Sequence, residues 1–197
     1  MNHAGRYFGL VGLIIGALLA SFFLLIELLL PLSLSLLLTI VFGLLLTGGF
    51  HEDGLADMTD GVGGGFTIER RLAIMKDSRL GTYGALALVV SMLLRYQLLL
   101  LLIPDTKAWL VLVLGHGLSR AVAGSLIFNT PYVSDAQGSK SKPLANHQNL
   151  LELVILLVTG GLPLLILPLI PVVIIIFTLF VCYSLVGQTV IYVDKDA

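Results

Sequence analysis

Long apolar runs constrain what this chain can fold into more than any other feature of its sequence. The runs consist mostly of leucine, isoleucine, valine and alanine, and they cover residues 8–30, 32–50, 82–103, 108–128, 150–170 and 172–193. A helix of about 20 such residues crosses the hydrocarbon core of a bilayer. The sequence therefore predicts an all-α, polytopic integral membrane protein with about six transmembrane helices.

The composition supports this class and excludes several others. Hydrophobic residues make up 57% of the chain and charged residues only 12%, and the mean hydropathy is +1.03, far from soluble globular usage. We therefore expect residues 1–197 to form a single membrane-embedded domain in contact with the lipid bilayer. The net charge of −1 leaves no basic field for nucleic acid. Cys182 is the single cysteine, so no disulfide framework is expected.

Residues 48–84 form the main polar segment of the chain. This segment holds half of the acidic residues, namely Glu52, Asp53, Asp57, Asp60, Glu69 and Asp77, and four basic residues, namely Arg70, Arg71, Lys76 and Arg79. Such a concentration of charge in an otherwise apolar chain indicates the functional site, and we expect residues 48–84 to form a catalytic loop.

The basic residues predict the orientation. With about six spans, the N-terminus, residues 48–84, residues 129–149 and the C-terminus lie on one side of the membrane. That side carries most of the basic residues: Arg6, Arg70, Arg71, Lys76, Arg79, Lys140, Lys142 and Lys195. The opposite side carries only Lys107. The positive-inside rule places the 48–84 loop in the cytoplasm, which predicts a multi-pass protein of the cell inner membrane.

Three aspartates in the loop stand at helical spacing. Asp53, Asp57 and Asp60 follow one another at i, i+4 and i+7, so on a helix they share one face. Like charges at this spacing repel, and a bound cation would compensate them. Oxygen ligands favour a hard cation such as Mg²⁺, with Glu52 as a further candidate ligand. The alternative is a solvated acidic helix end that favours the helix dipole.

Glycines and cations follow the aspartates. Gly63 and Gly64 belong to a glycine run whose exposed amides would bind substrate phosphate, and the alternative is a flexible connector. Ile68, Leu72 and Met75 mark one face of a short helix, which suits the membrane surface. Lys76 and Arg79 are candidate catalytic cations, and Asp77 and Ser78 are candidate substrate-binding residues. Such cations beside carboxylates suit a phosphate-bearing substrate, although flanking positive-inside charge explains them as well.

Four other ionisable side chains are candidates for a role. His51 is a base, a substrate contact or an interfacial residue, and the sequence leaves these three roles open. As proton acceptors, Asp60 is slightly favoured over His51. Arg120 lies inside a span, one turn from His116, and such an arginine is expected to face a partner or cavity. We expect it to bind a substrate phosphate or a cluster carboxylate. Arg95 is either structural or paired with Glu27, and the sequence leaves both open.

The polar segment resembles the signature of a known family. The sequences GGFHEDGLADMTDGVGGG at 48–65 and KDSRLGTYG at 76–84 are similar to those of the cobalamin synthases, the adenosylcobinamide-GDP ribazoletransferases. Residues 9–20, the GLSR of residues 117–120 and, more weakly, the NTPYV of residues 129–133 are similar to other parts of that family. The resemblance covers most of the chain, and its central motif is long and specific.

The resemblance implies substrates that the residues alone do not identify. It implies transfer of the cobinamide phosphate of adenosylcobinamide-GDP to α-ribazole or α-ribazole 5′-phosphate, with release of GMP and a requirement for Mg²⁺. Oligomeric state, including a homo-oligomer, is left open. The family pattern also has an extra segment upstream and a Gly-Asp motif downstream of a stretch like that at residues 186–189, so the chain is expected to be truncated at both ends.

Two other functions compete with this expectation. A metal-dependent phosphotransferase of the CDP-alcohol phosphatidyltransferase type also uses an Asp-rich cytoplasmic helix. Its usual signature has Ala-Arg after the first Asp-Gly group, where this chain has Met58 and Thr59. A divalent-cation transporter would need acidic residues inside its spans, and here the acidic residues gather in the loop.

Overall fold

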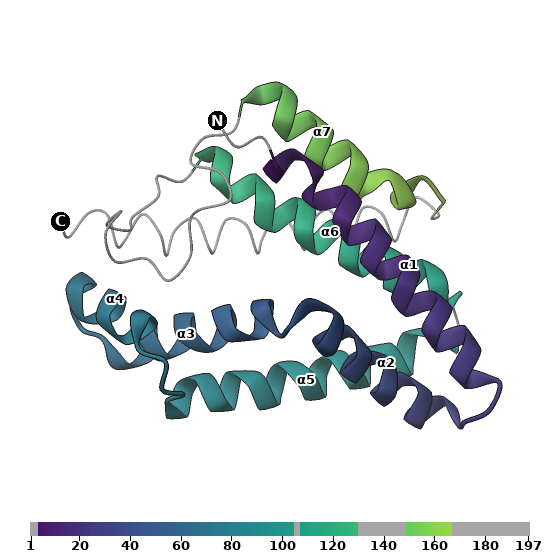
Figure 1. Ribbon diagram of the computed structural model, residues 1–197, viewed down its shortest axis with the longest axis horizontal. Coiled ribbons are helices and arrows are strands. Elements are labelled where there is room, and N and C mark those ends of the chain that lie inside the picture. Colours follow the sequence, from purple (N-terminus) through teal and green to yellow (C-terminus); the bar gives the residue numbers. More distant parts are fainter. Residues whose placement is uncertain (1–3, 105–106, 130–148, 167–197) are drawn as a thin grey trace. The chain divides into compact units, whose positions relative to one another are not determined.

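The computed structural model describes residues 4–104, 107–129 and 149–166, and this part of the chain is entirely helical (Figure 1). In order, its elements are η1 (Ala4–Tyr7), α1 (Phe8–Glu27), α2 (Leu32–Thr47), α3 (Phe50–Gly64), α4 (Ile68–Lys76), α5 (Thr82–Leu102), α6 (Ala108–Asn129), α7 (Leu150–Gly161) and η2 (Leu162–Ile166). The predicted all-α class is confirmed.

The helices divide into two compact units. The first unit comprises Met1–Ala20 and Trp109–Ala197, and the second comprises Ser21–Ala108. The boundary falls within α1, so this helix contributes its first part to one unit and its end to the other.

Several helices are long and apolar enough to cross a membrane. Among the described residues these are Ala4–Glu27, Thr82–Leu102 and Ala108–Leu126, with a fourth span if the bent pair α2 and α3 counts as one. The predicted spans at 82–103 and 108–128 match α5 and α6 closely. The predicted fifth span begins as α7 and continues as η2. The predicted sixth span, Lys140 and Lys142 lie outside the described residues, so the count of six stays a prediction.

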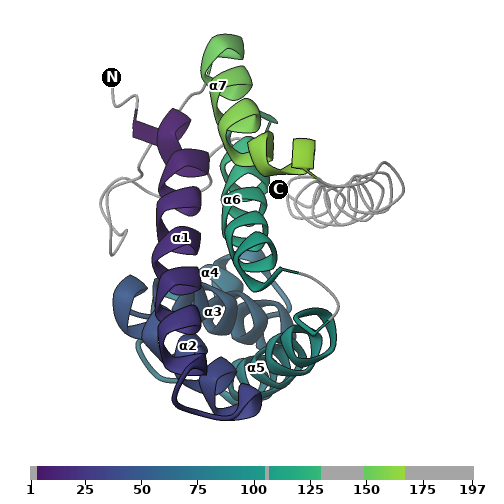
Figure 2. The ribbon, with the colours of Figure 1, turned by 90° about the vertical axis from the view of Figure 1, so that its right-hand side faces the viewer.

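Small residues bring the helices of the first unit together. Figure 2 shows the first part of α1 beside α6 and α7. A Cβ atom added at Gly9 of α1 would lie 2.6 Å from the Gly160 nitrogen of α7. A Cβ atom at Gly160 would lie 2.5 Å from the Cβ atom of Ala121 on α6. Such close backbone approach is how helices associate in lipid, where the hydrophobic effect provides no drive between them.

In the second unit the polar segment 48–84 contains two helices, α3 and α4. Glu52, Asp53, Asp57, Asp60 and most of the glycine run lie on α3, and the following amphipathic stretch forms α4. These helices agree with the helical spacing of the aspartates and with the predicted short helix, and the role of the segment as a cytoplasmic catalytic loop stays a prediction. Helix α5 lies beside α3 (Figure 1), and side chains such as Leu86, Val89 and Leu93 on α5 are more than half exposed, as lipid-facing residues are.

Two glycines separate α2 from α3. Gly48 and Gly49 have φ values of 66° and 67°, and the helix axes differ by 86° across this break. Other residues rarely adopt these backbone angles because a Cβ atom would approach the following carbonyl oxygen. The break therefore turns α3 away from the direction of α2, and it fixes where the acidic helix begins.

We expect Gly48→Ala to lower the free energy of unfolding by about 1–2 kcal/mol, the cost of a left-handed non-glycine residue. A Cβ atom at Gly48 would meet no atom of the described residues within 4 Å, so the loss would come from the backbone alone. Gly54 within α3 also has open space around its Cβ position and has no positive φ. Gly54→Ala should therefore stabilise the helix by about 0.5–1 kcal/mol. Unfolding of both variants in detergent micelles tests this, and equal effects would contradict it.

Candidate active site

Helix α3 carries the acidic residues of the candidate site. Its first turn contains Glu52 and Asp53, where negative charge is stabilised by the helix dipole. Asp53, Asp57 and Asp60 share one side of the helix, as their spacing predicts. Exposure falls along this acidic face, from the exposed Asp53 through the half-buried Asp57 to the buried Asp60.

Asp60 is bound to the start of α5. Its Oδ2 atom accepts a hydrogen bond of 2.7 Å from the Gly81 amide, and its Oδ1 atom accepts one of 2.8 Å from the Gly84 amide. Gly81 is the N-cap residue of α5, so the carboxylate satisfies two amides that the helix itself cannot pair. Both carboxylate oxygens of Asp60 are therefore engaged in hydrogen bonds with backbone amides at the start of α5.

Glu52 forms an ion pair that the sequence did not reveal. Its Oε1 atom lies 3.2 Å from Nη1 of Arg95 on α5, and its Oε2 atom is buried with no hydrogen-bond partner among the described residues. The side chain of Glu52 is 14% exposed and that of Arg95 is 44% exposed. Arg95 therefore pairs with Glu52 and not with Glu27, because α3 and α5 run side by side. This second contact holds the two helices in register.

The remaining acidic pair, Asp53 and Asp57, is a candidate site for a divalent cation. Within the described ranges, no group of three His, Cys, Asp or Glu side chains could hold a metal ion, so the predicted cluster of ligands does not assemble as a whole. Asp53 and Asp57 still present two carboxylates one turn apart on α3. Magnesium usually takes one or two carboxylates and completes its shell with water and substrate phosphates. This pair fits such a site.

The glycine run is helical and does not form a phosphate-binding loop or a flexible connector. Gly61, Gly63 and Gly64 belong to α3. A Cβ atom at Gly63 would lie 2.6 Å from the ring of Tyr83, and one at Gly61 would lie 2.7 Å from Cγ of Met75. These glycines thus allow α5 and α4 to approach α3. Contact of Gly63 and Gly64 with substrate stays a prediction.

Helix α4 is confirmed, and part of its apolar face packs on α3. Besides Met75, Ile74 approaches the glycine run, with its Cδ1 atom 3.4 Å from the Cβ position of Gly64. Thr67 caps the helix by accepting a hydrogen bond of 3.3 Å from the Arg70 amide. Backbone and Thr67 hydrogen bonds lower the pKa of Glu69. The Thr67 cap fixes the start of α4, and the packing of Met75 and Ile74 fixes the helix against α3.

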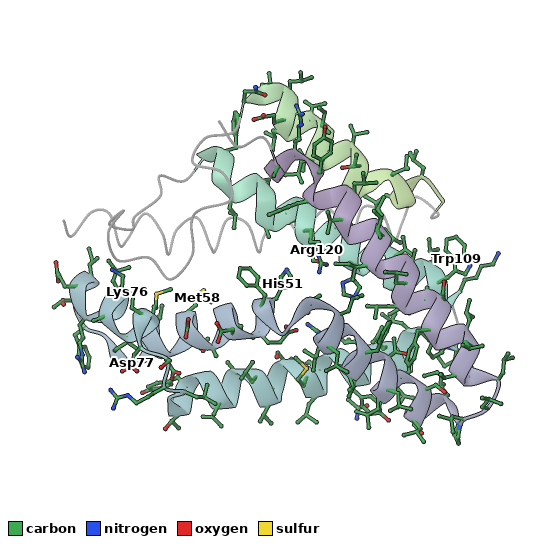
Figure 3. The ribbon with its side chains drawn as sticks, viewed as in Figure 1. His51, Met58, Lys76, Asp77, Trp109 and Arg120 are labelled. Carbon is green, nitrogen blue, oxygen red and sulfur yellow. The ribbon has the colours of Figure 1, made fainter. Side chains whose placement is uncertain are left out.

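The cations lie where α4 ends. Figure 3 shows Lys76 and Asp77 at this end of the helix. Asp77 is the C-cap residue, and its carboxylate accepts hydrogen bonds from Nε and Nη2 of Arg79, the latter at 2.6 Å. This hydrogen bonding and the negative charge of Asp77 raise the pKa of Arg79. The side chain of Arg79 is 87% exposed, and Lys76 and Ser78 are exposed too. The segment thus presents two exposed cations, and Asp77 orients one of them, Arg79.

His51 lies on a different side of α3 from the acidic face. It projects with Met58 away from α5 (Figure 3). It stands nine positions before Asp60 in the sequence, an offset of about half a turn in helical phase. Its ring makes an edge contact with Phe50, at 5.8 Å between centroids. The two candidate proton acceptors are therefore not adjacent.

Arg120 lies in the other unit, on α6. Its Nη1 atom is 3.0 Å from Nδ1 of His116 and 3.3 Å from the His116 carbonyl oxygen. The two residues thus lie one helical turn apart on α6, as their spacing predicts. Arg120 is only 8% exposed, and a buried guanidinium retains its charge. Its contact with substrate stays a prediction.

Sequence reasoning missed the roles of Arg95, Gly81 and Gly84. A signal for the glycines was present, because they stand at the start of the apolar run that becomes α5, where amides need acceptors. Nothing in the sequence identified Asp60 as the acceptor.

Comparison with known proteins places the chain in a family. The sequence model described as cobalamin-5-phosphate synthase matches residues 1–193. The chain belongs to the cobalamin-5-phosphate synthase family. Asp53, Asp57 and Asp60 therefore lie within the part of the chain that carries the family resemblance. No solved structure matches the chain.

Similar proteins of this family are named adenosylcobinamide-GDP ribazoletransferase. One from Vibrio parahaemolyticus is 53% identical over 180 residues, which cover 91% of this chain and 68% of the relative. Another from Shewanella pealeana is 56% identical over 167 residues, covering 84% and 64%. A third from Shewanella halifaxensis is 52% identical over 178 residues, covering 89% and 69%. The chain thus spans about two thirds of the length of these cobalamin-5-phosphate synthase relatives.

Proposed function

We propose that this protein transfers the cobinamide phosphate of adenosylcobinamide-GDP to α-ribazole or α-ribazole 5′-phosphate and releases GMP. The observation that carries the proposal is the identity of more than half of the aligned residues with relatives named for this activity. The fold agrees with it, because an acidic helix and a cation-bearing segment meet in one unit of a membrane protein.

The proposed reaction replaces one phosphorus–oxygen bond by another. A hydroxyl oxygen of the ribazole attacks the phosphorus that carries cobinamide, and the bond from that phosphorus to the bridging oxygen of GMP breaks. The hydroxyl proton goes to a base, and the leaving GMP retains the bridging oxygen and its negative charge. Such transfers depend mainly on positioning and electrostatic stabilisation.

The residues of α3 and of the cation-bearing segment 76–80 take distinct parts in this reaction. Asp53 and Asp57 would hold Mg²⁺, which supplies positive charge beside the pyrophosphate. Lys76 and Arg79 stabilise the negative charge on the leaving phosphate, and Asp77 orients the Arg79 guanidinium for this task.

Two further side chains are proposed to take part in the reaction. Arg120, held by His116, binds a substrate phosphate. His51 is the proposed base, because it is exposed, whereas both oxygens of Asp60 bind amides.

We propose that α3, α4 and the segment 77–80 face the cytoplasm at the inner membrane. Arg70, Arg71, Lys76 and Arg79 all belong to this region, and the positive-inside rule favours the cytoplasmic side for such clusters. A divalent-cation transporter is disfavoured, because α5 and α6 contain no aspartate or glutamate.

Turnover in isolated membranes tests the proposed function directly. Membranes containing the full chain, supplied with adenosylcobinamide-GDP, α-ribazole and Mg²⁺, should release GMP and form adenosylcobalamin. Chelation of Mg²⁺ should stop the reaction, and its return should restore it, because the acidic pair depends on the cation to approach a pyrophosphate. Membranes from cells that lack the chain are the control. Absence of GMP release from well-expressed protein would refute the proposal.

A further inference from the structure

We propose that Asp60 is a positioning residue that fixes the cation-bearing segment 76–80 to α3, with Gly81 and Gly84 as its partners. The proposal deepens the proposed function, on which the role of that segment rests. It replaces the expectation that Asp60 is a metal ligand or a proton acceptor. We call the contact of Asp60 with Gly81 and Gly84 the latch.

The first observation is the pairing of the carboxylate. Asp60 is only 8% exposed, and its two oxygens accept separate hydrogen bonds from the Gly81 and Gly84 amides at 2.7 and 2.8 Å. Hydrogen bonds to an ionised carboxylate are stronger than those between neutral groups, and the N-terminus of α5 adds favourable dipole electrostatics. A metal ion or proton would compete with two backbone donors for this carboxylate.

The second observation is the space around the two glycines. A Cβ atom at Gly81 would lie 2.7 Å from Cγ of Asp60. A Cβ atom at Gly84 would meet the same carboxylate and would lie 3.0 Å from the carbonyl oxygen of Ala56. Neither glycine has a positive φ. The contact with Asp60, and not backbone freedom, therefore explains why glycine occupies both positions.

The third observation is what the latch holds. Asp77 ends α4, and only residues 78–80 separate it from Gly81. This segment is thus held at one end by α4, which packs on α3 through Met75, and at the other end by Asp60. Arg79 lies between these two anchors. A cation that must meet a phosphate needs a fixed backbone, because misplacement of about 1 Å can cost about a hundredfold in rate.

Hydrogen exchange of the purified full chain tests the latch without substrate or Mg²⁺. In Asp60→Asn, the amides of residues 81–84 should exchange about tenfold faster or more, because the variant loses a charge-assisted acceptor in a buried site. Gly84→Ala should have the same effect while leaving every acidic side chain in place. Asp53→Asn, on the same face of α3 but exposed, is the matched control and should leave this exchange unchanged.

A second measurement separates positioning from metal binding. Asp60→Asn and Gly84→Ala should each lower kcat about tenfold or more, with an unchanged Mg²⁺ concentration for half-maximal turnover. Asp53→Asn should raise that concentration. Unchanged exchange at residues 81–84 in Asp60→Asn, or a raised Mg²⁺ requirement in that variant, would overturn the proposal. Because exchange needs no substrate, its result stands even if the proposed transferase activity fails its own test.

Discussion

Asp53→Asn is expected to lower turnover of adenosylcobinamide-GDP by about a hundredfold or more, since altering even the outer partners of a metal site commonly costs 10- to 100-fold. Asp53 is an exposed acid in the first turn of α3, one turn before Asp57. Asparagine keeps the size of the side chain and removes the charge that a magnesium ion requires. The rate should be measured in membranes over a range of Mg²⁺ concentrations, and higher Mg²⁺ should recover part of it.

The loss cannot come from a weakened helix alone. Removing an acid from the first turn of a helix costs about 0.3–1 kcal/mol, so Asp53→Asn should still insert into the membrane at normal level. Glu69→Gln is the matched control, because Glu69 is an exposed acid in the first turn of α4. It should retain near-normal turnover. Full activity of Asp53→Asn at normal expression would refute the role of this carboxylate in metal binding.

Much of the fold could be predicted because membrane helices are apolar along their whole length. The predicted span 82–103 corresponds to Thr82–Leu102, with Gly81 before it and Pro104 after it as natural boundaries. The break at Gly48 and Gly49 was also visible as a pair of glycines, yet its consequence was not. The spacing of Asp53, Asp57 and Asp60 predicted a helix face directly after this break, but it did not predict how α3 packs against α4 and α5.

The candidate site was predicted in its residues but not in their contacts. Helical phase placed Asp53, Asp57 and Asp60 on one face, and the structure confirms that phase. The phase could not show that Asp60 contacts amides 21 and 24 positions further along the chain. It equally could not show that Glu52 meets Arg95. These contacts depend on how α3 lies against α5, which local spacing does not encode. The acidic residues of α3 therefore serve two purposes. Glu52 and Asp60 contact α5, whereas the exposed Asp53 and the half-buried Asp57 are the candidate metal ligands.

The two arginines of the apolar helices should respond differently to lysine substitution, and Arg120→Lys should show the larger loss. Arg120 is buried and bound by His116, whereas Arg95 is 44% exposed in its pair with Glu52. Lysine keeps the charge but cannot present the planar fork that binds phosphate through two hydrogen bonds. We expect kcat/KM of Arg120→Lys to fall about tenfold to a hundredfold, the worth of one lost hydrogen bond to a charged group.

Arg95→Lys is the matched control, because it makes the same chemical change inside another apolar helix. An ion pair with a partly exposed member contributes about 0–1 kcal/mol, so this variant should stay within about fivefold of normal kcat/KM. Unfolding of both variants in detergent would show whether Arg120→Lys acts through stability instead. If Arg120→Lys unfolds normally and loses no more activity than Arg95→Lys, Arg120 does not bind the substrate phosphate.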